Sequence, residues 1–129
     1  MTQSQRILAK AYSEAKLLRE VIAIAKDFGW LVHHTHDSRT NEWGINKGVP
    51  DLTLAKDGRT VLIELKKQDA PVPAHQQAWL EASGGHLIRP LDAMTGEVHK
   101  ILGGKGDRVN ESYALAMDGF DSLSSHLHI

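Results

Sequence analysis

Apolar residues recur at spacings of three and four in the first part of the chain. Within residues 4–28 the repeating positions are Leu17, Leu18, Val21, Ile24, Ala25 and Phe28. This spacing gathers apolar side chains on one face of a helix. Gly29 follows the last of them and is a favourable place for the helix to end. The pattern predicts an amphipathic helix over residues 4–28.

Shorter apolar runs follow, separated by turn signals. They predict strands at residues 30–34, 49–55, 60–67 and 86–90. Asp57-Gly58 between the second and third runs is a strong hairpin signal, so this pair is expected to be antiparallel. Pro73 suits a helix start, and a helix over residues 74–82 would link the third and fourth strands as a parallel crossover. With a last helix inside residues 91–102, the order predicts an α/β fold with a mixed central sheet flanked by helices.

Composition narrows the class of protein. At 129 residues without cysteine, the chain is expected to form one domain that uses neither disulfides nor thiolate metal sites. We assign residues 1–104 to this domain and residues 105–129 to an acidic tail where the pattern is lost. No signal peptide and no apolar stretch of membrane-spanning length is recognisable, so a soluble, cytoplasmic protein is expected, with no membrane partner.

Charge is unevenly distributed along the chain. The net charge is −1, yet residues 1–106 carry 14 basic against 12 acidic residues, a balance of +2. Residues 107–129 carry 1 basic against 4 acidic residues, a balance of −3. The body of the protein can therefore present a basic groove, although the overall charge does not demand one.

Two short motifs carry the candidate chemistry. Gly48-Val49-Pro50-Asp51 is followed thirteen residues later by Glu64-Leu65-Lys66. Residues two apart on a strand point to the same face, so Glu64 and Lys66 should project side by side. The hairpin would bring Asp51 opposite them. Two converging carboxylates suit a hard divalent cation, and a neighbouring lysine can orient a water or an anionic oxygen, as phosphodiester hydrolysis requires.

The position of Glu64 within an apolar run strengthens this interpretation. A carboxylate buried there is costly unless it is paired or binds a metal. The alternative is a purely structural ion pair between Glu64 and Lys66. For Asp51 the alternative is an acid that stabilises the turn after Pro50.

These residues resemble the PD-(D/E)XK nuclease superfamily and, within it, the virus-type replication-repair nuclease (VRR-NUC) family. The matching pieces are an acid in the first helix, Gly48-Val49-Pro50-Asp51, Glu64-Leu65-Lys66, and Gln76 with Trp79 three residues on. The resemblance covers roughly residues 14–90. It implies a metal-dependent endonuclease that cuts DNA, often at branched structures. Small members are similar to Holliday-junction resolvases and act as homodimers.

The resemblance also implies roles for individual residues. The catalytic candidates are Asp51, Glu64, Lys66 and Gln76. The candidate ligands for Mg²⁺ or Mn²⁺ are Glu14, Asp51, Glu64 and the backbone carbonyl of Leu65. The candidate DNA phosphate contacts are Arg39, Lys47 and Lys67.

Several alternatives remain open at this stage. On a helix over residues 4–28, Glu14 lies near the middle of the apolar stripe and Glu20 about 100° away, which favours Glu14 as the ligand. Glu14 could instead be an acid that stabilises the helix start. A zinc site at His34 and His36 is disfavoured, because nothing completes a tetrahedral set. The alternative functions are a restriction-type sequence-specific endonuclease and a non-catalytic DNA-binding or assembly module.

Overall fold

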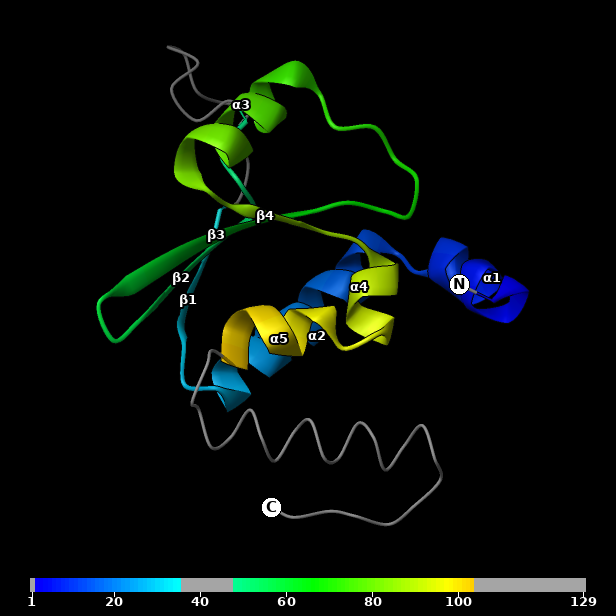
Figure 1. The fold of residues 1–129 in the computed structure, drawn as a ribbon, viewed down its shortest axis with the longest axis horizontal. Helices are drawn as coiled ribbons and strands as arrows, with labels where there is room; N and C mark the ends of the chain where they lie inside the picture. Colours follow the sequence, from blue (N-terminus) through cyan, green and yellow to red (C-terminus); the bar gives the residue numbers. More distant parts are fainter. Residues whose placement is uncertain (1, 36–47, 104–129) are drawn as a thin grey trace.

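A computed structural model describes residues 2–35 and 48–103, which form a four-stranded sheet flanked by helices (Figure 1). The helices are α1 (Gln3–Ala11), α2 (Glu14–Asp27), α3 (Ala74–Ser83), α4 (Pro90–Met94) and α5 (Glu97–Gly103). The strands are β1 (Leu31–His34), β2 (Leu52–Lys56), β3 (Arg59–Leu65) and β4 (His86–Ile88). The α/β class and the mixed sheet flanked by helices agree with the sequence prediction.

The sheet has the order β1-β2-β3-β4. The pairs β1–β2 and β2–β3 are antiparallel, and β3–β4 is parallel, as the hairpin signal and the helical crossover predicted. Asp57 and Gly58 form the turn between β2 and β3 with φ angles of 50° and 79°. Two successive positive φ values are typical of a tight hairpin turn, and Asp-Gly adopts them at low cost. This turn sets the register on which the candidate site depends.

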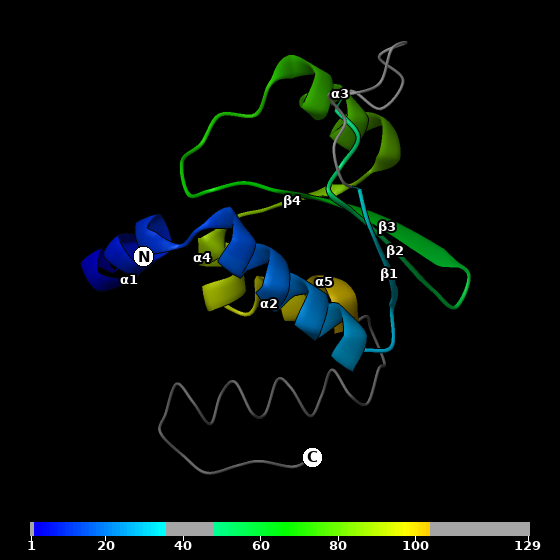
Figure 2. The same cartoon turned by 180° about the vertical axis from the view of Figure 1, so that it is seen from behind.

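Helices cover the two faces of the sheet unequally. In both views α3 lies on one side, while α2, α4 and α5 lie on the other (Figures 1 and 2). Leu52 pairs with Ile63, and both side chains are fully buried on the face toward α2. Because side chains alternate along a strand, Glu64 belongs to the opposite face, which α3 covers. The core sits between the sheet and the helices α2 and α5.

The predicted helix over residues 4–28 is wrong in one respect, because the structure divides it into α1 and α2. The break falls at Tyr12 and Ser13, which have extended backbone angles. The Ser13 hydroxyl accepts a hydrogen bond from the Lys16 backbone N–H at 3.0 Å, which caps the start of α2. Glu14 is therefore the first residue of α2, where it is exposed although it lies on the face of the helix that carries the buried Leu17 and Val21, as its spacing predicted.

The end of the described chain also differs in detail from the prediction. Two short helices, α4 and α5, occupy the region where one helix was expected, with a turn at Thr95-Gly96 between them. Arg39, Lys47 and the predicted tail at residues 105–129 lie outside the described residues. None of the helices within residues 2–35 and 48–103 has both the length and the apolar character needed to cross a bilayer.

Candidate active site

The turn before β2 positions Asp51. Gly48 has a φ of +82°, and a side chain there would meet the His75 carbonyl oxygen at 2.7 Å, so the turn packs directly on the first residues of α3. One Asp51 carboxylate oxygen accepts a hydrogen bond from the Leu65 backbone N–H at 2.8 Å. The Asp51 carbonyl accepts another from the Thr35 backbone N–H, also at 2.8 Å. Asp51 is thus held between the ends of β1 and β3.

Glu64 and Lys66 lie side by side, as their spacing predicted. The Lys66 ammonium nitrogen is 3.4 Å from a Glu64 carboxylate oxygen. Glu64 is only 3% exposed, and the Lys66 side chain is 15% exposed. Lys66 follows the last residue of β3, and its backbone N–H donates to the Ile88 carbonyl at 3.2 Å. The pairing with β4 therefore continues past the strand and fixes the backbone that carries this lysine.

Burial and a neighbouring acid change the proton affinity of Glu64. Burial, together with the negative charge of Asp51, raises the pKa of Glu64 to about 7 from its ordinary value of 4.5. The Lys66 charge and hydrogen bonding from the Asp51 backbone act in the opposite direction without cancelling the increase. The β2–β3 register explains the proximity, because Leu52 pairs with Ile63 and the next residues outward are Asp51 and Glu64. The two carboxylates form one electrostatically coupled pair.

A small pocket opens beside Asp51 on the side of the sheet that faces α2. Its volume is about 130 Å³. The lining residues are Glu14, Ala15, Leu18, His34, Asp51 and Leu65. The structure thus brings three of the predicted ligand residues, Glu14, Asp51 and Leu65, to one cavity. The α1–α2 break makes this possible, because it places Glu14 at the helix start that faces the cavity.

Glu20, the alternative acid, has a different environment. Its carboxylate accepts a hydrogen bond from the Tyr12 hydroxyl at 2.8 Å. Burial and this acid together raise the pKa of Tyr12 to about 12. Glu20 does not line the pocket. The geometry therefore favours Glu14 over Glu20 as the helix residue nearest to Asp51.

Gln76 lies in the first turns of α3, on the side of the sheet that carries Glu64. Its side-chain oxygen is buried and has no hydrogen-bond partner among the described residues. The neighbouring Gln77 instead donates to Glu81 at 3.2 Å along the exposed surface of α3. A buried amide oxygen without a partner is costly in a folded protein, so it commonly marks a place where a water, an ion or a ligand binds.

The predicted residues are therefore divided between the two faces of the sheet. Glu14 and Leu65 line the pocket on the α2 side, whereas Glu64 and Lys66 belong to the α3 side. Asp51 connects the two groups, because it lines the pocket and also acts on the charge of Glu64. His34 in the pocket wall has no counterpart in the motifs. In the sequence it stood out only as half of a disfavoured zinc pair with His36, which lies outside the described residues.

The residues present suit one kind of metal ion better than another. The described parts of the chain contain no group of three or more histidine, cysteine or acidic side chains arranged to hold a metal. A closed zinc centre does not fit them. Mg²⁺ binds through only one or two carboxylates and keeps several waters, and Asp51 with Glu64 supplies such a pair. Burial, and after it the negative charge of Asp51, raises the pKa of Glu64, and a cation bound beside both carboxylates would act against both effects.

Comparison with protein-family models, curated protein sequences and solved structures finds no match to this chain. The case for a function therefore depends on the residues themselves and on their geometry.

Proposed function

We propose that this protein is a metal-dependent endonuclease that hydrolyses phosphodiester bonds in DNA, and that it belongs to the VRR-NUC family of the PD-(D/E)XK superfamily. One observation carries the proposal. The carboxylate of Glu64 is buried beside Asp51 and lies 3.4 Å from the Lys66 ammonium, at one end of a mixed sheet. An acid pair with an adjacent lysine is the minimum set for this reaction.

The residues take separate roles in this proposal. Asp51 and Glu64 would hold Mg²⁺ or Mn²⁺, and Glu14 and the Leu65 carbonyl, which line the pocket on the other side of Asp51, would offer further oxygen ligands. The bound cation supplies Lewis-acid chemistry at the phosphate and lowers the pKa of water. Lys66 orients the attacking water and offsets the negative charge that develops on the phosphate. Gln76 donates its amide N–H groups to the phosphate or accepts from a water.

Branched DNA, such as a four-way junction, is the substrate class we propose. This choice rests on the resemblance of the motifs to the VRR-NUC family, whose members often cut branched structures. Cutting two strands of a junction requires two sites, so the proposal includes a homodimer related by two-fold symmetry.

The test is cleavage of labelled four-way junction, flap and linear duplex DNA in Mg²⁺ or Mn²⁺. We expect the wild type to cut the branched substrates and Lys66→Ala and Asp51→Asn to lose at least about 100-fold in rate, as removal of a charge-stabilising group commonly does. Lys100→Ala, an exposed lysine on α5, is the matched control and should cut normally. Cleavage of linear duplex at fixed sequences would replace the junction proposal with a restriction-type enzyme.

A non-catalytic DNA-binding or assembly module is the second candidate function. It is favoured by the Lys66 ammonium, which already neutralises Glu64 without any metal. Thermal melting with added Mg²⁺ separates the two candidates. The endonuclease should gain stability that rises with the logarithm of the Mg²⁺ concentration once this exceeds the dissociation constant, and Asp51→Asn should remove that gain. A module without a metal site should melt at the same temperature with or without Mg²⁺.

A further inference from the structure

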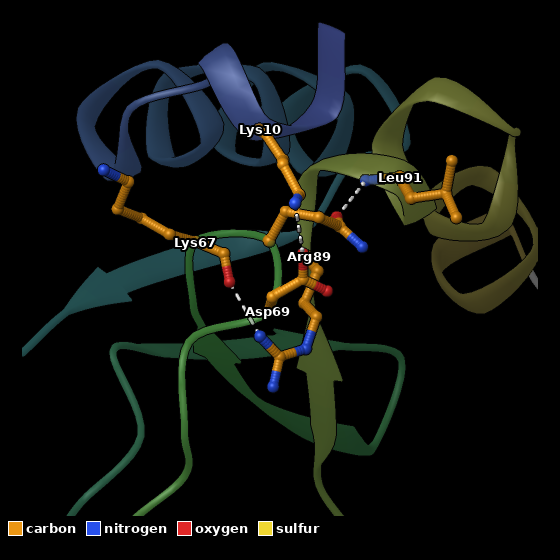
Figure 3. A network of polar contacts seen from close by, with 6 residues as sticks. Lys10, Lys67, Asp69, Arg89 and Leu91 are labelled. Carbon is orange, nitrogen blue, oxygen red and sulfur yellow. Dashed lines mark hydrogen bonds and ion pairs between the residues drawn. The ribbon is translucent and has the colours of Figure 1, made fainter. Parts of the chain in front are cut away.

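Three basic residues from separate parts of the chain lie around the linker that follows Lys66. They come from α1, from the linker after β3 and from the residue after β4, and they are Lys10, Lys67 and Arg89. Figure 3 shows Lys10 reaching from α1 toward this linker, with Arg89 on the other side of it. Lys67 directly follows the candidate catalytic lysine, so the linker begins at the proposed site, while the side chains of the two lysines leave the backbone on opposite faces.

Hydrogen bonds within the protein hold this group in place. The Arg89 guanidinium donates to the Lys67 carbonyl at 2.7 Å. The Gln68 side-chain oxygen accepts from the Leu91 backbone N–H at 3.1 Å, which ties the same linker to α4. One guanidinium nitrogen is engaged in this way, and a guanidinium has further N–H donors that can bind an anion.

The group keeps a net positive charge, because three basic side chains face two nearby acids, Asp69 and Asp92. Asp92 uses its carboxylate to accept from the Arg89 backbone N–H at 2.8 Å. The amino group of Lys67 extends away from Asp69 (Figure 3). Within the described parts of the chain, an ion pair of the group joins Lys10 to Asp69 at 3.7 Å, with the two side chains 62% and 66% exposed.

That single ion pair is weak enough to be exchanged. Ion pairs between exposed side chains contribute at most about 1 kcal/mol. A phosphate oxygen that approaches Lys10 would replace one anion by another at small net cost. Asp69 would then compete with the phosphate for Lys10.

We propose that Lys10, Lys67 and Arg89 form a phosphate-binding surface that holds the nucleic-acid backbone next to the cleavage site, with Asp69 as an internal competitor. The proposal rests on the proposed nuclease function and adds the direction in which the DNA leaves the site, toward α1 and α4. Arg6 lies four residues before Lys10 on α1, so the surface extends by one helical turn along the same face.

Binding of a fluorescently labelled four-way junction, measured by anisotropy without Mg²⁺ over a range of salt concentrations, tests this surface. Lys10→Ala and Lys67→Ala should each weaken binding roughly three- to tenfold and reduce the salt slope by about one. Asp69→Asn should tighten binding by a similar factor, because it removes the competing charge. Asparagine also tolerates the positive φ of 68° at this position.

The exposed Lys100–Glu97 pair on α5, at 3.8 Å, supplies matched controls. Lys100→Ala and Glu97→Gln should leave both affinity and salt slope unchanged. Wild-type affinity and slope in the Lys10 and Lys67 variants would overturn the phosphate surface, while loss of cleavage in Lys66→Ala would still support the nuclease. If the wild-type protein binds no DNA at all, the surface and the nuclease proposal both fail.

Discussion

At the scale of single residues, Glu64 is the charged residue that the described part of the chain buries, at 3% exposure. A carboxyl group whose pKa is higher in the folded than in the unfolded state makes the folded state bind more protons between the two values. The contribution of Glu64 to the free energy of unfolding is therefore fully present below about pH 4.5. It is lost as the pH rises to about 7. The loss amounts to at most about 3 kcal/mol.

Glu64→Gln should remove this pH dependence from the metal-free protein. Urea denaturation measures the unfolding free energies of the wild type and the variant. Between pH 5 and pH 8 the wild type should lose stability relative to the variant. Glu81→Gln, which changes an exposed acid on α3, is the control and should show no such shift. A constant difference across this pH range would contradict a raised Glu64 pKa.

The proximity of the candidate residues Asp51, Glu64 and Lys66 was the most predictable part of the site. Glu64 lies close to Lys66 because side chains alternate along a strand. Asp51 lies close to Glu64 because the Asp57-Gly58 turn sets the register of the two strands. Both depend only on residues close in sequence. The pairing of Glu20 with Tyr12, by contrast, depends on the direction in which the chain leaves α1, and the apolar spacing carries no information about that direction.

At the scale of elements, the contact between the turn before β2 and the start of α3 determines where Asp51 and Gln76 stand relative to one another. Gly48→Ala would place a methyl group 2.7 Å from the His75 carbonyl oxygen at a residue with φ of +82°. Gly58 has a similar φ of +79° but nothing within 4 Å of the added atom. Comparing alanine substitutions at the two glycines therefore distinguishes the cost of backbone strain from the cost of steric overlap.

We expect Gly58→Ala to lower the unfolding free energy by about 1 kcal/mol through backbone strain alone. Gly48→Ala should lose about 1–3 kcal/mol more, because the overlap forces α3 and the turn apart. Urea denaturation of both variants measures the difference. Equal losses would mean that the turn and α3 can separate without cost.

Element boundaries were less predictable than the elements themselves. The apolar repeat over residues 4–28 is continuous, so it did not reveal the break between α1 and α2. The local signal was present in Ser13 followed by Glu14, a capping residue and an acid in a first helical turn. Periodicity describes which face is buried, while caps decide where a helix starts.

At the scale of the whole molecule, Trp30 links the first strand to the last described helix. Its indole N–H donates to the Leu102 carbonyl at 2.8 Å across 72 residues of sequence. The ring is 3% exposed and lies under the Arg59 guanidinium, 5.1 Å from the ring centre. This contact closes the side of the core near the β2–β3 hairpin.

Trp30→Phe should lower the unfolding free energy by about 1–3 kcal/mol, because a buried carbonyl loses its donor. Trp79→Phe, on the outer surface of α3 with 38% exposure, should change it by less than about 0.5 kcal/mol. Thermal or urea denaturation of both variants provides the comparison. Similar losses for the two tryptophans would show that the Trp30–Leu102 link is not important for stability.

Long-range arrangement explains what the sequence could not predict about the site. Lys10 and Arg89 meet the linker after β3 because α1 packs against α4, and no local pattern encodes that packing. His34 likewise forms part of the pocket wall through a tertiary contact, because α2 lies across the sheet at the end of β1. Linear motifs locate the candidate chemistry, whereas the surface that would receive a substrate depends on tertiary contacts.

Because the ammonium of Lys66 stands next to the carboxylate of Glu64, the chain carries its own counter-ion through folding. Proteins whose clustered ligands have no such partner fold only when metal is supplied. If the site binds Mg²⁺ as we propose, the native state would not have to wait for the ion, and loading would be a separate and reversible event after folding. A cell that runs short of magnesium would then hold a reserve of intact, idle protein, ready to resume work when the supply returns.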